Sequence, residues 1–60
     1  MKVKIQDGVT FDVMTESAWL EDVIPDDNDR WFAAQELRNT GRCWIGGGAA
    51  PLVYLTVILR

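Results

Sequence analysis

The first thirteen residues alternate between apolar and polar side chains on either side of an Asp7-Gly8 step. The apolar positions are Val3, Ile5, Val9, Phe11 and Val13. Such alternation around a glycine-containing step predicts a β-hairpin. A three-residue loop, Gln6-Asp7-Gly8 with Gly8 in the left-handed conformation, separates the two faces best. The pairs that it predicts are Ile5 with Val9, Val3 with Phe11, Lys4 with Thr10, and Lys2 with Asp12.

After Met14 the alternation stops and apolar residues recur at helical spacing. They are Trp19, Leu20, Val23 and Ile24. Thr15 or Ser17 can cap a short helix here, and Pro25 ends it because proline disfavours helical backbone at the preceding residue. We expect Trp19 to lie in the core beneath the sheet.

The run Asp26-Asp27-Asn28-Asp29 predicts the start of a second helix, since aspartate is a good N-cap and the helix dipole favours carboxylates in the first turn. This helix should continue to about Asn39. Its apolar residues are Trp31, Phe32, Ala33, Ala34 and Leu37. Arg38 in the last turn and Gly41 just beyond are ordinary stop signals.

The final segment predicts a second hairpin, with strands at 42–45 and 52–59 joined by a glycine-rich connection. Gly46-Gly47-Gly48 lacks the Gly-Lys-Ser/Thr sequence and the following helix of a phosphate-binding loop, so we interpret it as a turn between strands. The last strand carries one wholly apolar face, formed by Val53, Leu55, Val57 and Leu59. A strand of this kind belongs in the middle of a sheet or beneath a partner.

The order of elements is therefore β-β-α-α-β-β. It predicts an α+β fold in which a four-stranded antiparallel sheet carries one or two short helices on one face. We expect residues 1–60 to form a single small domain.

Composition limits how so short a chain is stabilised. It has 60 residues, 48% of them hydrophobic, and buries only about 60% of its unfolded surface. Domains of this size often need disulfides, metals or oligomerisation. With one cysteine, Cys43, and no histidine, we expect no internal disulfide, no metal site and no cofactor, which leaves dense packing or a homodimer. Cys43 itself is interpreted as a small buried hydrophobe.

The same inventory argues against catalysis. Without histidine the usual general base near neutral pH is missing, and nothing activates Cys43 as a nucleophile. Paired carboxylates could still act as acid and base, but the chain leaves little room for the roughly 300 Å³ pocket that a small ligand requires. We expect that the protein is not an enzyme.

Two observations bear on location. The N-terminal segment has no apolar stretch of the kind found in a secretory signal. Residues 43–59 contain seventeen residues without a charge, but their glycine-rich and proline-containing middle would make a poor membrane helix. We therefore expect a cytoplasmic protein without a membrane span.

Charge is distributed unevenly along the sequence. Eight acidic residues and no lysine or arginine occur from Asp7 to Asp29, although the net charge is only −3. Such a surface would repel phosphates, so we expect no direct binding to nucleic acid and a partner protein with a basic surface, which could belong to a nucleic-acid-binding complex. The predicted partner-binding residues are Glu21, Asp22, Asp26, Asp27, Asp29, Arg30 and Trp31.

Two interpretations of these residues stay open. The carboxylates could form a docking face, or they could only cap and solvate helix ends. Trp31 is the best candidate for an exposed tryptophan, since three tryptophans exceed what one small core easily hides. Alternatively, Trp31 covers the core as a lid.

The functional hypothesis is a stoichiometric inhibitor whose carboxylates stand where nucleic-acid phosphates normally bind on the partner. In size and charge the chain is similar to small acidic inhibitors of phages and mobile elements, which act on restriction or CRISPR-type nucleases. The main alternative is a homo-oligomeric structural or accessory subunit that assembles through the apolar strand at 52–59.

Overall fold

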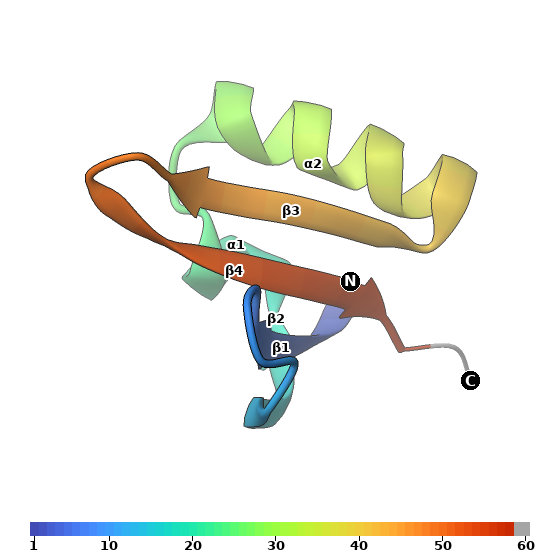
Figure 1. Cartoon of the computed structure of the whole chain (residues 1–60). Helices are drawn as coiled ribbons and strands as arrows, with labels where there is room; N and C mark the ends of the chain where they lie inside the picture. Colours follow the sequence, from blue (N-terminus) through green and yellow to red (C-terminus); the bar gives the residue numbers. More distant parts are fainter. Residues whose placement is uncertain (59–60) are drawn as a thin grey trace.

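The computed structural model describes residues 1–58 and shows a four-stranded antiparallel sheet with two helices on one face (Figure 1). The elements are β1 Lys2–Asp7, β2 Val13–Trp19, α1 Leu20–Val23, α2 Asp27–Thr40, β3 Arg42–Gly47 and β4 Ala50–Val57. The α+β class and the β-β-α-α-β-β order are therefore confirmed.

The last strand lies inside the sheet, whose order is β2-β1-β4-β3. β4 pairs with β1 along one edge and with β3 along the other, as Figure 1 shows. The predicted central position of this strand is confirmed, while Leu59 lies outside the described residues. Both edges of β4 are occupied, so its backbone has no free edge to offer to a second chain.

The core lies between the sheet and the two helices. Its buried members are Val3, Leu20, Ile24, Ala33, Leu37, Cys43 and Leu55. Val3 and Leu55, from the neighbouring strands β1 and β4, are fully buried. Ala33 and Leu37 lie one helical turn apart and present the same side of α2 to the sheet. The buried position predicted for Cys43 is confirmed.

Local capping determines where α2 begins and ends. The side chain of Asp26 accepts a hydrogen bond of 2.9 Å from the backbone N–H of Asp29. At the other end Gly41 adopts a left-handed conformation, with φ of 80°, and donates its N–H to the carbonyl of Leu37 at 2.8 Å. Both ends agree with the predicted helix to within one residue, and Arg38 lies in the last turn.

The register predicted for the first hairpin is wrong. The observed pairs are Lys2 with Trp19, Val3 with Ala18, Ile5 with Thr15, and Gln6 with Val13. Between the second and third pairs, Glu16 and Ser17 together oppose Lys4, which is a β-bulge. The segment predicted as the second strand, from Val9 to Asp12, is instead part of the loop.

Asp7 explains why the loop is longer than expected. Its carboxylate accepts the N–H groups of Val9 and Thr10 at 2.7 and 2.9 Å, which folds the chain back locally. The backbone of Asp7 also accepts from the N–H of Phe11 and donates to the carbonyl of Asp12, both at 2.9 Å. These bonds close a loop over residues 8–12, so pairing resumes only at Val13.

Gly8 serves a different purpose from the one predicted. Its φ is not positive, and the left-handed residue of this loop is Phe11, with φ of 62°. Gly8 lies against β4, where it donates its N–H to the carbonyl of Leu52 at 2.9 Å. A β-carbon at this position would lie 2.6 Å from the Leu52 side chain, so glycine is needed for close approach and not for turn geometry.

The first predicted helix is largely a strand. Thr15 and Ser17 lie within β2, and α1 retains only four residues, Leu20–Val23. No side chain caps α1. Pairing with β1 supplies hydrogen bonds to the whole segment up to Trp19, and this outweighs the weak helical tendency of one amphipathic turn.

Strand geometry also moves Trp19 out of the core, so its predicted burial is wrong. Trp19 pairs with Lys2 and is 50% exposed, with the Lys2 ammonium 5.1 Å from the centre of the indole ring. Leu20, the next residue, fills the core position and is 2% exposed. A change from strand to helix between these two residues therefore decides which apolar side chain is buried.

The uncharged segment that follows Arg42 forms β3, a turn and β4, which confirms the predicted hairpin. The predicted connection is too long, however, since Gly46 and Gly47 belong to β3 and Pro51 belongs to β4. Gly46 has φ of 82°, and a β-carbon there would lie 2.0 Å from the carbonyl oxygen of Pro51, so the two strands approach closely only because this residue is glycine. No helix within residues 1–58 is long and apolar enough to cross a membrane.

Candidate functional site

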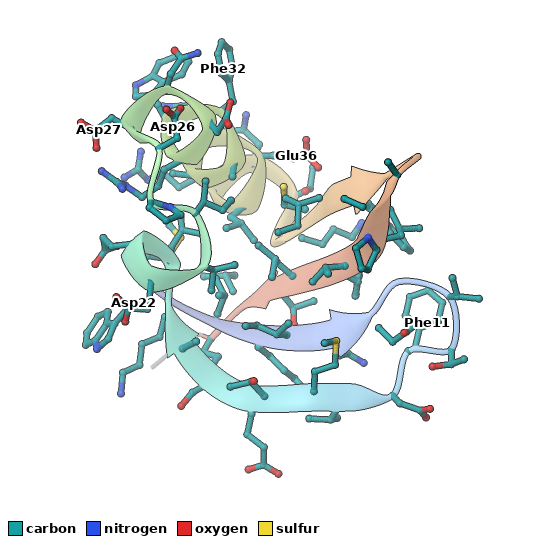
Figure 2. All side chains as sticks on the ribbon, turned by 90° about the vertical axis from the view of Figure 1, so that its left-hand side faces the viewer. Phe11, Asp22, Asp26, Asp27, Phe32 and Glu36 are labelled. Atoms are coloured by element: carbon teal, nitrogen blue, oxygen red, sulfur yellow. The ribbon has the colours of Figure 1, made fainter. Side chains whose placement is uncertain are left out.

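The α1–α2 junction brings together all seven residues predicted to bind a partner. Two lie in α1, one caps α2, and four lie in its first two turns; they are Glu21 and Asp22, then Asp26, and then Asp27, Asp29, Arg30 and Trp31. The five acidic residues among them are exposed. Figure 2 shows Asp22, Asp26, Asp27 and Phe32 on the side of the molecule away from Phe11.

Three of the five carboxylates have partners within the chain. Asp26 caps α2, Asp27 forms an ion pair with Arg30, and Glu21 lies 3.8 Å from the N-terminal amino group of Met1. Helix capping and local ion pairing thus explain the presence of these three carboxylates. Ion pairs this exposed contribute little to stability, about 0–1 kcal/mol.

Asp22 and Asp29 differ from the other three. Within residues 1–58 neither side chain forms a hydrogen bond to another residue or an ion pair, although the backbone N–H of Asp29 bonds to Asp26. Both side chains lie on the exposed surface of the junction. Their carboxylates are available for a partner without the loss of an internal contact.

Arg30 is the least exposed of the predicted residues. Its guanidinium donates to the carbonyl oxygens of Ile24 and Pro25 at 3.2 and 3.1 Å, in addition to its pair with Asp27. These carbonyls belong to the short link between α1 and α2. Arg30 therefore fixes the angle of the junction and supports the surface from beneath.

Trp31 and Phe32 project from α2 as an adjacent aromatic pair. They are 57% and 61% exposed, their ring centres are 5.1 Å apart, and the planes are nearly perpendicular at 88°. The predicted exposure of Trp31 is confirmed. Phe32 was not among the predicted site residues, although a signal existed: neighbours on a helix point about 100° apart, so two adjacent aromatics cannot both face the core side marked by Ala33 and Leu37.

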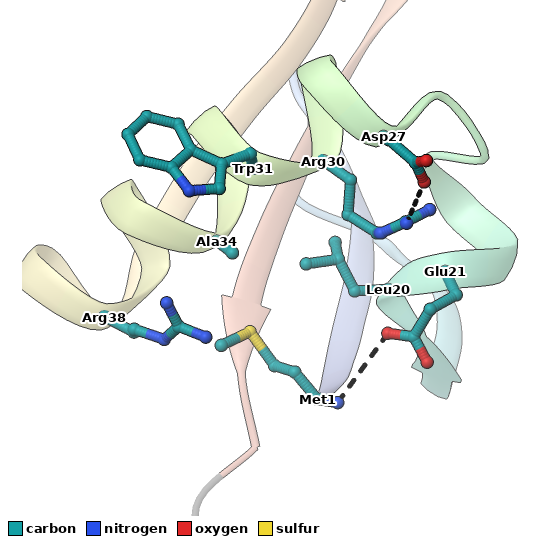
Figure 3. A pocket seen from close by; sticks show the side chains of 8 residues that line it. All are labelled: Met1, Leu20, Glu21, Asp27, Arg30, Trp31, Ala34 and Arg38. Atoms are coloured by element: carbon teal, nitrogen blue, oxygen red, sulfur yellow. Dashed lines mark hydrogen bonds and ion pairs between the residues drawn. The ribbon is translucent and has the colours of Figure 1, made fainter.

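A hollow of about 290 Å³ lies beside Trp31, between α2, α1 and the N-terminus (Figure 3). Its lining residues are Met1, Leu20, Glu21, Asp27, Arg30, Trp31, Ala34 and Arg38. The volume is close to that of the smallest ligand pockets, which the length of the chain did not lead us to expect. The lining combines apolar side chains with charges of both signs, so the hollow suits an amphipathic side chain of a partner.

A second aromatic cluster lies on the other face of the sheet. Phe11 stands edge-on to Trp44 and to Tyr54, with ring centres 5.6 and 5.3 Å apart, and Trp44 and Tyr54 are 4.5 Å apart. Gln6 holds the loop in place by donating its side-chain N–H to the carbonyl of Phe11 at 2.8 Å. This cluster was not predicted, because its members come from the β1–β2 loop, β3 and β4 and meet only in the folded sheet.

The surroundings of Asp7 and Cys43 shift the pKa values of these two groups. The N–H groups of Thr10 and Val9 lower the pKa of Asp7 because they bind its ionised form. Burial raises the pKa of the Cys43 thiol, and the negative charge of Glu36 raises it further. The thiol is therefore protonated at neutral pH, a poor state for a nucleophile.

Comparisons of the chain with protein-family models, curated proteins and solved structures found no match. Within residues 1–58, no group of three or more histidine, cysteine, aspartate or glutamate side chains is arranged to hold a metal ion. Functional inference for this protein therefore depends on the chemistry of its own surface.

Proposed function

We propose that this protein is a protein-binding module that docks its α1–α2 junction on a basic surface of a partner. The observation that carries the proposal is the exposed pair Trp31 and Phe32 on α2, together with the unpaired carboxylates of Asp29 on the same helix and of Asp22 on the neighbouring helix α1. We call these four residues the acidic–aromatic face.

The two kinds of side chain would make different contributions to binding. Aromatic residues that become buried at the centre of an interface contribute most of its energy, often about 2 kcal/mol or more for each. Carboxylates around them steer a basic partner into place and raise the association rate, an effect that salt weakens. The hollow beside Trp31 would accept a side chain of the partner, which would increase the shape complementarity of the interface.

The form of the function that we propose is inhibition. A basic surface large enough to attract this face is typical of proteins that bind nucleic acid, and carboxylates held there would occupy the positions of phosphates. The protein would then act stoichiometrically, in the manner of the small anti-restriction and anti-CRISPR proteins of phages and mobile elements.

The alternative of a homo-oligomeric subunit has less support from the geometry. It required the strand at 52–59 to pair with its counterpart in a second chain, and β4 pairs with β1 and β3 instead. A second copy would have to pair with β2 or β3, which are the edge strands of the sheet. Sedimentation equilibrium across a concentration series tests this alternative directly.

The docking proposal is tested with a charge-reversed double variant, Asp22→Lys with Asp29→Lys. Within residues 1–58 these two side chains have no hydrogen bond or ion pair to lose, so the fold should survive, which circular dichroism checks. The matched control is Gln35→Lys with Glu36→Lys and Asn39→Lys, an equal total change of charge in the second half of α2, outside the junction and outside the open face of the sheet. The immobilised wild type and both variants are used to capture proteins from a nuclease-treated lysate of the host, across a salt series.

We expect a nucleic-acid-binding protein to be captured by the wild type and the control, and to be lost from the junction variant and at high salt. The purified partner should also release its labelled nucleic acid when the wild type is added in equimolar amount, but not when the junction variant is added. A partner retained equally by all three forms, or one whose binding ignores salt, would contradict the proposal. Trp31→Ala gives an independent test, since it should weaken binding without a change of charge.

A further inference from the structure

The sheet has an open face that neither helix covers. Val3 and Ile5 point toward the helices, so Lys2, Lys4 and Gln6 alternate onto the opposite side of β1. Residues directly opposite each other in antiparallel strands share a face. The open face therefore also carries Tyr54 and Thr56 of β4, Arg42 and Trp44 of β3, and Trp19 of β2.

Two rows of side chains cross this face at adjacent positions. One is polar and basic, with Lys4 on β1, Thr56 on β4 and Arg42 on β3. Beside it, Gln6 on β1 is followed by the aromatic side chains of Tyr54 and Trp44. Lys4 and Gln6 are two residues apart on one strand, so the rows lie about 7 Å apart.

The loop that carries Phe11 is fixed above the second row. Phe11 is held at φ of 62°, which is unfavourable for a bulky residue, and its ring contacts both Trp44 and Tyr54. Strain of this kind persists only where surrounding contacts impose it, and it is concentrated at functional sites. Phe11 nevertheless remains 46% exposed and Trp44 44% exposed, so the cluster still offers aromatic surface to a ligand.

We propose that this open face binds single-stranded nucleic acid. Bases would stack on the aromatic row, and the sugar-phosphate backbone would follow the basic row. We call the residues Lys4, Phe11, Arg42, Trp44 and Tyr54 the sheet platform. Stacking on exposed aromatics of a four-stranded sheet, with bases splayed out along it, is a general mode of single-strand recognition.

Charge complementarity favours this occupant over an acidic protein. Lysine and arginine in one row can contact phosphates, and the adjacent aromatics can stack against the flat bases that those phosphates link. The junction carboxylates belong to α1 and the start of α2, and those labelled in Figure 2 lie away from Phe11, so the net charge of −3 does not describe this face. Two carboxylates lie near the platform: Glu16 opposes Lys4 in the bulge of β2, and Asp12 follows Phe11 in the loop, where it accepts a hydrogen bond of 3.0 Å from the Thr10 hydroxyl.

This site goes beyond the proposed docking function and uses different residues. It also departs from the expectation, drawn from the linear distribution of charge, that the protein does not contact nucleic acid directly. A molecule with both faces would join a basic protein on one side to a single strand on the other. Failure of either site leaves the other untouched, because each is tested with its own ligand and its own variants.

The test measures fluorescence anisotropy with fluorescein-labelled single strands of twelve nucleotides, one of oligo(dT) and one of oligo(rU), at several salt concentrations. The two strands distinguish DNA from RNA as the ligand. We expect saturable binding to at least one of them. A duplex of the same length should bind at least about tenfold more weakly, since its bases are not free to stack on the sheet.

Variants locate the site. Trp44→Ala should weaken binding about tenfold or more through lost stacking. Lys4→Gln with Arg42→Gln should flatten the dependence of log affinity on log salt by about 1.4, which is roughly 0.7 for each lost phosphate contact. Glu16→Gln should strengthen binding, and Trp31→Ala on the opposite side should leave it unchanged.

Several results would overturn the proposal. They are no binding to either strand, equal binding to the duplex, equal binding to a poly-glutamate peptide labelled in the same way, and binding that Lys4→Gln with Arg42→Gln does not alter. If Trp44→Ala fails to fold by circular dichroism, the lysine and arginine variants decide the question, because these charged side chains lie outside the buried core.

Discussion

The acidic–aromatic face and the sheet platform are built from the same kinds of residue in opposite combinations. On the helical side, Trp31 and Phe32 contact each other and stand beside carboxylates. On the open side, Trp44 and Tyr54 lie on the strands, have Phe11 above them, and stand beside lysine and arginine. The two faces also differ in how far each supports the fold.

This difference shows what a net charge conceals. A value of −3 for the whole chain is an average over one surface rich in carboxylates and another with basic residues. An exposed tryptophan likewise carries little information by itself, since Trp31 and Trp44 are similarly exposed but have opposite electrostatic neighbours. The following experiments test how independent the two faces are, beginning with the largest expected effect.

Leu55→Ala should disrupt both faces at once. Leu55 is fully buried on the central strand, between the helices and the sheet. Truncation of a buried leucine costs about 2–5 kcal/mol, and a domain of this size has only about 3–9 kcal/mol of stability in total. Urea denaturation followed by circular dichroism should show a lowered or absent transition. If Leu55→Ala unfolds at the same urea concentration as the wild type, the core between the sheet and the helices is not the source of stability.

Trp44→Ala should destabilise the protein by about 1–3 kcal/mol, less than a fully buried aromatic, because the ring is half exposed and packs against Tyr54 and Phe11. Trp31→Ala, the matched change on the other face, should remain within about 0.5 kcal/mol of the wild type. Thermal unfolding of the two variants side by side provides the comparison. Equal losses would contradict the claim that only the platform aromatics support the fold.

Asp26→Ala should lower the free energy of unfolding by about 1 kcal/mol, within the range of 0.5–2 kcal/mol observed for lost N-caps. Asp22→Ala should have almost no effect, since its carboxylate contacts no other side chain within residues 1–58. Chemical denaturation of both variants separates the structural carboxylates of the junction from those free to bind. The prediction is wrong if Asp22 proves as important to stability as Asp26.

The smallest effect concerns pH and the loop that supports Phe11. The pKa of Asp7 is lowered in the folded protein, so its contribution to stability is full above its ordinary value of 3.8 and is lost as pH falls through the lowered folded-state value. Asp7→Asn should therefore be less stable than the wild type near neutral pH, and the difference should shrink below about pH 4. Unfolding curves across this range test it, and a difference independent of pH would show that the ionised form is not the one held by Val9 and Thr10.

The parts of the fold that were predictable are those encoded within a few residues. Asp26 and Gly41 determine the ends of α2 through contacts three and four residues away, and sequence reasoning located both. The register of β1 with β2 depends partly on Gly8 lying against Leu52, which is 44 residues further along the chain. No local pattern contains that contact.

The same distinction separates the two surfaces. The acidic–aromatic face was mostly predicted because the junction is continuous in sequence, from Glu21 to Trp31. The sheet platform was missed because strand pairing brings Phe11, Trp44 and Tyr54 together from three elements. Trp19 shows how strongly burial depends on the exact end of a strand. If β2 had ended one residue earlier, Trp19 would have taken the buried position that Leu20 occupies.

The central place of β4 has a consequence for biosynthesis. β1 and β3 have no direct hydrogen bonds and are joined only through a strand that ends at Val57. A nascent chain can form the first hairpin and α2 early, but the sheet cannot close until the ribosome has released the residues of β4. Such late, non-local pairing slows folding. Until then the backbone edges of β1 and β3 that pair with β4 stay open, so this is the interval in which a nascent chain would be most exposed to chaperones and proteases.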